Sequence, residues 1–432
     1  MMVVLSGPLA VDTFFLMSGF LMSYLTLKEY DKRGFRFFDP VNGYIHRYIR
    51  LTPAYGLIML VLTTLILHLG SGPQWERMEA QSELCEKYWW RNLLYINNLF
   101  DEDKSCMGES WYLACDFQLF LMGPWICFLI WKFKRMGVLL MIGLLSLFIA
   151  IPGILTGIND WPMQNFTTII GKGWMYGFYF RFYTRATPYI WGLILGYVCY
   201  KTPDIHRTKG IRKIPKIVIW IGWLVSAGLI LSTSFGLVNY WPVDLSCPQY
   251  PDDPDKKCYD TTTAVIWACF GRLAWSIGVS WIIFACMNGY GGFVNTFLSW
   301  PGFGPLARLT YTIYLIHLHI MFQFWFGADQ PMHYDKYLIV SEKLKPIKSE
   351  FSEISFFQFV LFFGHFVVTI MFATLASLLF EAPFIGLEKL VFGRKPLNGH
   401  VNDAVTKDEE QQIEKSEKPE TNGHVSNQIT RL

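Results

Sequence analysis

Charged residues are scarce in this chain. Asp, Glu, Lys and Arg make up 16% of its 432 residues, against roughly 25% in soluble domains. Hydrophobic residues make up 52% and the mean hydropathy is +0.28, which excludes a disordered chain and argues against a soluble globule. The formal net charge of +3 is too close to neutral to indicate nucleic-acid binding. The 17% of aromatic residues is typical of a membrane protein with aromatic belts at its two interfaces.

Several catalytic motifs are also absent. The sequence has no Walker loop ending in Gly-Lys-Ser/Thr, no HExxH and no cysteine cluster with zinc-ligand spacing. Nucleotide hydrolysis and zinc chemistry are therefore unsupported, and no metal is expected. No repeat of solenoid period occurs either.

Long apolar segments are what the chain does contain. A helix crosses the hydrocarbon core with about 20 mostly apolar residues. The segments of about this length are residues 3–27, 51–70, 110–131, 136–155, 186–200, 217–237, 263–287, 309–326 and 356–380. The sequence thus predicts an all-α, polytopic membrane domain over residues 1–390, with about nine transmembrane helices and the lipid bilayer as its surroundings.

The charges outside these segments predict the orientation. Loops 28–50, 132–135 and 201–216 are rich in Lys and Arg, and the predicted spans place all three on one side, which the positive-inside rule makes cytosolic. After Pro396 the chain has no aromatic residue and almost no apolar run. Residues 391–432 are therefore predicted to be a disordered cytosolic tail, because they bury too little surface to offset their ordering entropy.

The opposite loops carry cysteines in pairs. Loop 71–109 contains Cys85 and Cys106, and loop 238–262 contains Cys247 and Cys258. Two cysteines in each of two outward loops predict disulfides in an oxidising compartment, with unpaired thiols as the alternative. A glycosylation sequon at Asn165 lies in another outward loop. The plasma membrane and the endoplasmic reticulum both fit this arrangement.

The N-terminal segment predicts a helix upstream of this chain. The sequence opens directly in an apolar stretch without the basic residues that begin a signal peptide. Nine spans also put the two ends of the chain on opposite sides. We therefore expect at least one preceding helix, for a total of about ten or more.

Ionisable residues inside predicted spans are costly, which makes them functional candidates. If Asp12 merely capped its helix, only residues 14–27 would remain to cross the membrane, which is too few. A functional or charge-paired Asp12 is therefore favoured over a cap. Arg47 and Arg50 are three residues apart and share a helix face, where two guanidiniums can clamp a phosphate or carboxylate. Anchoring to lipid head groups is the alternative for this arginine pair.

Other polar residues lie deeper in the chain. Asp116 lies about two turns into the third predicted helix and needs a buried partner or a raised pKa. Arg272, in the seventh predicted helix, is the expected partner, from charge and depth alone. His317 and His319 lie in one span, near two tyrosines, where functional imidazoles are more common than for a lone core histidine. His365 is a further ionisable residue in the last span.

Five segments resemble, in the same order, the signature elements of the membrane acyltransferase-3 family. They are residues 11–21 (VDTFFLMSGFL), 47–53 (RYIRLTP), 110–116 (SWYLACD), 311–317 (YTIYLIH) and 381–383 (EAP). In the third element, Tyr112 replaces the usual serine and Asp116 the usual glutamate. The cysteine-bearing outer loop and the stretch WYLACDFQ resemble the nose-resistant-to-fluoxetine branch of animals most. The resemblance covers about residues 1–390.

This resemblance implies a function. It implies transfer of an acyl group, commonly acetyl, from cytosolic acyl-CoA to a hydroxyl of a lipid or sugar. It also implies an essential histidine on a helix just before residues 11–21, which this sequence does not contain. The animal branch is associated with movement of lipids and drugs, so a lipid or drug transporter without acyl transfer is the alternative.

We therefore expect a membrane O-acyltransferase-like protein with acyl-CoA as its co-substrate. The candidate catalytic residues are Asp12, Arg47, Arg50, Asp116, Arg272 and His317. The arginine pair would bind the donor, one of the two aspartates would orient a histidine base, and Arg272 would stabilise the oxyanion. His317 would line the same cavity. No motif indicates the acceptor, the acyl chain length or the oligomeric state.

Overall fold

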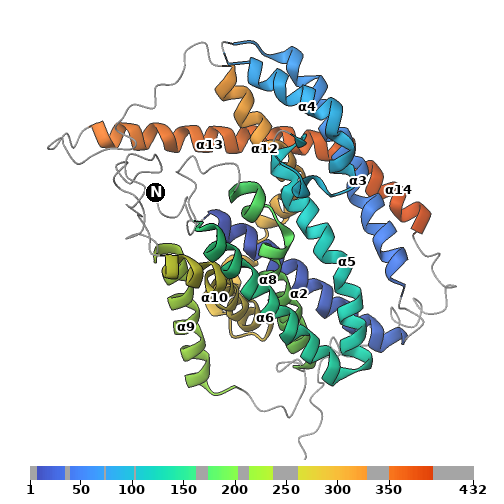
Figure 1. Ribbon diagram of the computed structural model, residues 1–432, viewed down its shortest axis with the longest axis vertical. Helices are drawn as coiled ribbons and strands as arrows, with labels where there is room; N and C mark the ends of the chain where they lie inside the picture. The colour runs from blue at the N-terminus through green and yellow to red at the C-terminus, as the bar shows by residue number, and fades with distance from the viewer. Residues whose placement is uncertain are drawn as a thin grey trace, which may run out of the picture. The chain divides into compact units, whose positions relative to one another are not determined.

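The computed structural model describes residues 7–34, 39–72, 74–101, 104–161, 174–202, 214–236, 261–327 and 350–392. Within these ranges every regular element is helical (Figure 1), as the composition predicts. Residues 1–384 form one compact unit and residues 385–432 another, and the packing and sites described below belong to the first. The predicted disordered tail lies almost entirely outside the described residues and remains a prediction.

The described helices occur in the following chain order. The first half of the chain forms α2 (Gly7–Arg33), α3 (Pro40–Thr64), η2 (Ile66–Leu69), α4 (Glu76–Leu93), η3 (Asn97–Leu99), η5 (Gly108–Ser110), α5 (Trp111–Lys132), α6 (Lys134–Asn159), the π-helical turn η6 (Met175–Tyr179) and α8 (Phe182–Lys201). The second half forms α9 (Lys216–Phe235), α10 (Thr261–Met287), α11 (Gly292–Leu298), α12 (Phe303–Phe326), α13 (Glu350–Ala376), the π-helical turn η9 (Ser377–Glu381) and α14 (Ala382–Phe392).

Among the described residues, six helical stretches are long and apolar enough to cross a membrane. They are Gly7–Arg33, Gly108–Lys132, Lys134–Asn159, Lys216–Phe235, Thr261–Met287 and Leu361–Leu387. These stretches confirm the polytopic helical prediction. The predicted spans 51–70, 186–200 and 309–326 are also helical, as parts of α3, α8 and α12, but they do not reach the same apolarity. Each of these three helices buries polar side chains inside the protein, Thr52, Arg185 and His319 among them.

The helix α3 begins eleven residues before the predicted span 51–70. Pro40 occupies its first turn, where a missing backbone N–H costs nothing. The Asp39 side chain caps the same turn by accepting a hydrogen bond from the Asn42 backbone N–H at 3.0 Å. The helix therefore carries Arg47 and Arg50 within its length, and neither arginine lies in a loop.

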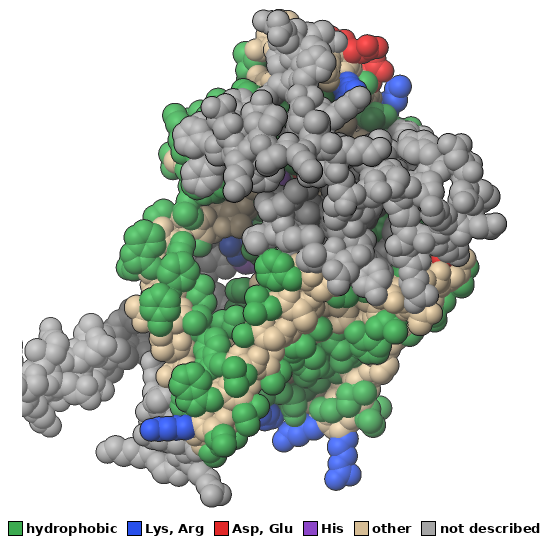
Figure 2. Space-filling view, turned by 90° about the vertical axis from the view of Figure 1, so that its left-hand side faces the viewer, with side chains coloured by type: hydrophobic (Ala, Val, Ile, Leu, Met, Phe, Trp, Pro, Cys, Tyr) green, Lys and Arg blue, Asp and Glu red, His purple; other side chains and the backbone are tan. Residues whose placement is uncertain are grey.

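Basic side chains lie along the lower edge of the helical unit in Figure 2. The carboxylate of Asp31, near the end of α2, accepts hydrogen bonds from Trp131 Nε1 at 3.1 Å and from the Tyr200 hydroxyl. These contacts bring together the C-terminal ends of α2, α5 and α8. The basic residues at these helix ends are Lys28, Lys32, Arg33, Lys132 and Lys201. The prediction that the three basic loops start on one side is thus confirmed for the described residues, and the compartment they face remains a prediction.

A disulfide lies toward the other end of α5. Cys85 in α4 is bonded to Cys106, which precedes the first residue of α5, with a Cα–Cα distance of 4.2 Å. This pair confirms one of the two predicted disulfide loops. Cys247, Cys258 and the Asn165 sequon lie outside the described residues.

The helix α5 belongs to two packing clusters. One cluster joins it to α2, α6 and α8, and includes Trp111 and Leu119. The other joins it to α3, α12 and the α4–α5 connection, and includes Leu113 and Ala114. Side chains on opposite faces of α5 therefore contact both clusters, and more than half of the apolar part of this helix is buried.

The closest packing is between α2 and α8, which run parallel (Figure 1). A Cβ atom on Gly19 would lie 2.1 Å from the Tyr189 carbonyl oxygen, and a Cβ on Gly192 would lie 2.2 Å from the Leu16 carbonyl oxygen. Gly196, four residues after Gly192, approaches the Phe20 carbonyl in the same way. Small residues at this spacing let two membrane helices bring their backbones into contact.

We predict that Gly192→Ala destabilises the protein. The added methyl group meets backbone atoms of α2, so the helices must separate, at a cost of about 1–3 kcal/mol. The measurement is the midpoint of chemical denaturation in detergent. Gly143→Ala on α6 is the matched control, because its Cβ would have no atom within 4 Å and alanine is the better helix former. Equal midpoints for the two variants would contradict the proposed backbone contact.

Candidate functional site

A buried carboxylate lies between two guanidiniums where α2, α8 and α10 meet. Arg185 Nη1 donates a hydrogen bond to Asp12 Oδ1 at 2.9 Å, and Arg272 Nε lies 3.7 Å from Asp12 Oδ2. The side chains of Asp12 and Arg185 are each 1% exposed, whereas that of Arg272 is 13% exposed. Charges buried this deeply persist only when they are paired and hydrogen-bonded. Asp12 is therefore charge-paired, as favoured from the sequence.

Backbone carbonyls and aromatic rings complete the environment of the two arginines. Arg185 Nε donates to the Tyr179 carbonyl at 3.1 Å, and Arg272 Nη1 donates to the Thr184 carbonyl at 2.5 Å. The Arg185 guanidinium lies 4.0 Å from the Tyr179 ring centroid, and that of Arg272 lies 5.2 Å from the Phe178 ring centroid. Such cation–π contacts stabilise a desolvated guanidinium. Both rings and one carbonyl come from the π-helical turn η6, which shapes this wall of the site.

The cluster carries an excess of positive charge. In the described part of the chain, Asp12 is the sole carboxylate in ion-pair contact with Arg185 or Arg272. One negative charge therefore faces two positive charges within a buried space. Arg272, the more exposed of the two arginines, is the group best placed to meet an additional anionic atom.

Asp116 pairs with a different arginine from the one expected. Its Oδ2 accepts from Arg47 Nη2, and its Oδ1 accepts from the Ser18 hydroxyl at 2.7 Å. The expected pairing of Asp116 with Arg272 is therefore wrong, because α10 packs against α2 and α8 and brings Arg272 to Asp12 instead. The Arg47–Asp116–Ser18 contacts link α2, α3 and α5.

Arg47 and Arg50 have different surroundings although they are three residues apart. The Arg47 guanidinium lies 4.2 Å from the Phe120 ring centroid, and its Nε is buried without a hydrogen-bond partner within the described structure. Arg50 is exposed and makes no ion pair with a described residue. The pair therefore combines one arginine oriented by a carboxylate with one that is open to a ligand.

A third buried pair joins α12 to the start of α5. His319 Nδ1 lies 2.9 Å from Glu109 Oε1, and both side chains are almost fully buried. The Tyr314 hydroxyl donates to the Glu109 backbone carbonyl. His317, the candidate from the sequence, instead directs Nδ1 to the Tyr314 carbonyl of its own helix at 2.7 Å. Because a carbonyl only accepts, that contact makes Nδ1 of His317 the protonated nitrogen.

Amide side chains fix the loop before α5. Asn98 Nδ2 donates to Gln118 Oε1 at 3.1 Å, and Gln118 Nε2 donates to Asn98 Oδ1 at 2.8 Å. The Tyr95 hydroxyl, in the same connection, lies 3.1 Å from Thr52 Oγ1. Burial raises the pKa of Tyr95 to about 12, so this phenol stays neutral and can act as a donor.

The first turns of α5 connect the three charged clusters. The Trp111 ring centroid lies 5.3 Å from the Arg185 guanidinium, and the Tyr112 ring centroid lies 5.6 Å from that of Tyr314. Asp116 follows one turn later. The described structure thus places Asp12, Arg47, Asp116 and Arg272 around α2 and α5, and it leaves Arg50 and His317 outside the ion pairs. No group of three or more metal-ligating side chains is present among the described residues.

Three buried ionisable residues were not among the sequence candidates for catalysis: Glu109, Arg185 and His319. Arg185 lies just before the predicted span 186–200, where a charged residue is ordinarily interfacial. Glu109 likewise precedes an apolar segment. His319 could have been recognised from its position two residues after His317, because this spacing places the two imidazoles on different sides of the helix.

Comparison with known proteins identifies relatives. Residues 1–382 match an acyltransferase domain, Acyl_transf_3. The chain is 31% identical over 423 residues to nose resistant to fluoxetine protein 6 of Caenorhabditis elegans, covering 92% of this chain and 47% of that protein. It is 23% identical over 354 residues to regulator of hypoxia-inducible factor 1 of the same organism, covering 76% and 63%.

A bacterial enzyme is also similar. O-acetyltransferase OatA of Staphylococcus aureus is 29% identical over 243 residues, covering 54% of this chain and 36% of that protein. The chain therefore spans less than two thirds of the length of each of these relatives. No solved structure matches the chain.

We predict that Asp12→Asn destabilises the protein more than Arg185→Gln does. Asp12→Asn leaves two buried guanidiniums without a counter-charge and costs about 3–5 kcal/mol. Arg185→Gln leaves Asp12 with Arg272 and costs about 1–3 kcal/mol, mainly from lost hydrogen bonds. The measurement is the free energy of unfolding in mixed micelles. The control is Asp101→Asn, whose exposed contact with Lys104 contributes less than about 1 kcal/mol. An equal cost for the two buried variants would contradict the charge excess.

Proposed function

Since the chain belongs to the acyltransferase-3 family, we propose that it transfers an acyl group from cytosolic acyl-CoA to a hydroxyl of a lipid or sugar. The family match over residues 1–382 and the similarity to a bacterial O-acetyltransferase support an acyltransferase-like function. The donor, the acceptor and the activity of the whole protein belong to the proposal. The proposal also includes the location of the protein, which is the plasma membrane or endoplasmic reticulum, with its basic end and its C-terminal tail in the cytosol.

The observation that carries the proposal is the excess positive charge of the Asp12–Arg185–Arg272 cluster. Acyl transfer passes through a tetrahedral intermediate whose former carbonyl oxygen is negative, and preorganised donors at that oxygen lower the barrier. Asp12 holds Arg185 by a direct hydrogen bond, while Arg272 is held less closely and is partly exposed. Arg272 is therefore assigned to the oxyanion, as expected from the sequence.

The arginines of α3 are assigned to the donor. Arg50 is exposed and presents a full guanidinium, which binds phosphate bidentately. Arg47, which is oriented by Asp116, adds its positive charge on the same helix. The positive charge gathered at the ends of α2, α5 and α8 attracts the phosphates of coenzyme A toward the protein.

The bond changes follow from this assignment. The acceptor oxygen attacks the thioester carbonyl and gives its proton to a base. The new C–O ester bond forms, the C–S bond breaks, and the coenzyme A thiolate leaves and takes up a proton. The resemblance places the histidine base before residues 11–21, so no described residue is given that role.

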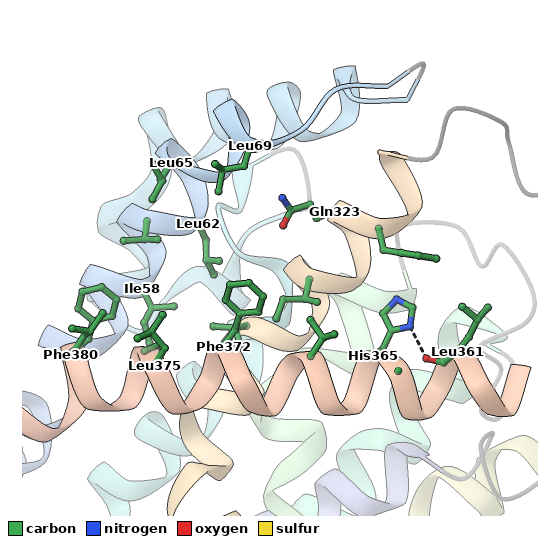
Figure 3. Close-up of a pocket in the computed structure, with 18 residues that line it drawn as sticks. Ile58, Leu62, Leu65, Leu69, Gln323, Leu361, His365, Phe372, Leu375 and Phe380 are labelled. Atoms are coloured by element: carbon green, nitrogen blue, oxygen red, sulfur yellow. Dashed lines mark hydrogen bonds between the residues drawn. The ribbon is translucent and has the colours of Figure 1, made fainter.

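A second candidate is movement of a lipid or drug across the bilayer without a covalent product. The observation that favours it is a large apolar groove between α3, α12 and α13 (Figure 3). The two candidates differ in one measurable product, because acyl transfer yields a labelled ester and transport does not.

We predict that Arg50→Ala lowers acyl transfer by at least about tenfold, mainly through a higher KM for acyl-CoA, because a charge-assisted phosphate contact contributes roughly 1.5–3 kcal/mol. The measurement is transfer of radiolabel from acetyl-CoA to lipid and sugar fractions, in membranes that contain the full-length gene product. Arg50→Lys should recover only part of the activity, since lysine lacks the bidentate fork.

The control is Arg135→Ala, which removes another exposed arginine that has no assigned role. Abundance of both variants is compared by immunoblot, and normal abundance with lost transfer supports the donor assignment. Collapse of the Arg50→Ala protein would make Arg50 a folding residue. Absence of labelled ester with the folded wild-type protein would overturn acyl transfer and favour the transport candidate.

A further inference from the structure

A long apolar groove lies apart from the charged clusters. It has a volume of about 790 Å³ and is lined by α3, η2, α12, α13 and η9. Figure 3 shows Ile58 and Leu62 of α3 facing Phe372 and Leu375 of α13 across it. The volume falls in the range of about 300–1,000 Å³ that is typical of small-molecule sites.

The groove opens between surfaces that face lipid. Large apolar side chains beside it are exposed, including Leu60 on α3 and Phe366 and Met371 on α13. The residues Leu361–Leu387 form one of the candidate membrane spans. In a membrane protein such surfaces contact hydrocarbon, so the abundant apolar molecule that can enter from the side is a lipid acyl chain.

The length of the groove fits such a chain. Its lining on the α13 side runs from Leu361 to Phe380, which is about 28 Å at about 1.5 Å per helical residue. One leaflet of the hydrocarbon core is about 15 Å thick, half of the whole core. The groove therefore holds an extended lipid chain along its length with room for a polar group at one end.

A half-buried imidazole supplies the polar group. His365 Nδ1 lies 2.8 Å from the Leu361 carbonyl oxygen, and its Nε2 is buried without a hydrogen-bond partner within the described structure. Because the carbonyl only accepts, Nδ1 carries the proton and Nε2 of the neutral ring is an acceptor. Figure 3 shows the bonded nitrogen turned to Leu361 and the ring standing above α13 on the groove side. An unsatisfied acceptor in an apolar site requires a donor.

We propose that this groove binds one acyl chain of a hydroxyl-bearing membrane lipid, whose hydroxyl donates a hydrogen bond to His365 Nε2. The bound lipid is a second ligand beside acyl-CoA, since no residue of the Asp12–Arg185–Arg272 cluster lines the groove. A sugar does not fit the groove, because Gln323 and His365 are its main polar lining residues and the hydroxyls of a sugar would be left unsatisfied. His365 is thereby a lipid-binding residue.

The binding test uses a photoreactive lipid. Diacylglycerol with a diazirine in one acyl chain is incorporated into phosphatidylcholine vesicles that contain the full-length protein, and the crosslinked peptides are identified by mass spectrometry. The expected crosslinks fall on α3, α12 and α13. The same lipid with its hydroxyl methylated should crosslink about tenfold less at equal concentration, as expected for one lost hydrogen bond.

One variant fills the groove, a second is its control, and a third removes the hydrogen-bond acceptor of His365. Gly364→Phe places a ring in the groove, and a Cβ at this position has no atom within 4 Å, so it should abolish the crosslinks without unfolding the protein. Gly143→Phe makes the same change at an open position of α6 and should crosslink like the wild type. His365→Phe keeps an aromatic ring against Phe324, whose centroid lies 4.8 Å away, and should bind the hydroxyl and methylated lipids equally.

Each outcome decides one part of the proposal. Crosslinks confined to other helices, or unchanged in Gly364→Phe, would overturn the groove as a lipid site. Retained preference for the hydroxyl in His365→Phe would overturn the role of Nε2. The crosslinks decide whether the groove binds lipid, whether or not the wild type forms an ester.

Discussion

The backbone contact between α2 and α8 is the constraint on which the rest of the site depends. Gly19 and Gly192 remove the side chains that would otherwise hold the two helices apart. Only at this close approach can the short Asp12 side chain reach Arg185 directly. Because a buried charge without its partner costs several kcal/mol, the glycines and the ion pair stabilise the same arrangement. Any helix separation that relieves one contact breaks the other.

The polar interior also explains the hydropathy of individual helices. The helices that carry most lipid-facing surface, such as α6 and α9, are strongly apolar with few buried positions. In contrast, α8 is packed among α2, α6 and α10, so its side chains contact other parts of the protein. The buried ones include the polar residues Thr184, Arg185 and Thr187. The low apolarity of α8 therefore accompanies its central position around the candidate site.

The sequence predicted the helical membrane fold, one disulfide and the burial of Asp12, because each depends on local composition or on a cost that any fold must meet. It did not predict which partner each charge would find. Asp116 and Asp12 are both acidic residues near the start of a helix, and only the packing of α10 against α2 assigns Arg272 to Asp12. Similarly, the family-like motif singled out His317, yet a rotation of about 200° over two helical residues gives the buried carboxylate contact to His319.

The charge excess at Asp12 has a consequence for reactivity. Two guanidiniums and one carboxylate in a nearly dry space leave positive potential that water screens weakly. A neutral thioester gains little from this potential, whereas the oxyanion formed on attack gains a full charge interaction. In the proposed acyl transfer, the cluster would therefore favour the intermediate over the bound substrate, which is the condition for catalysis as opposed to simple binding. Arg185 is held by Asp12, by the Tyr179 carbonyl oxygen and by the Tyr179 ring. Its contribution to the field would therefore be fixed before a substrate arrives.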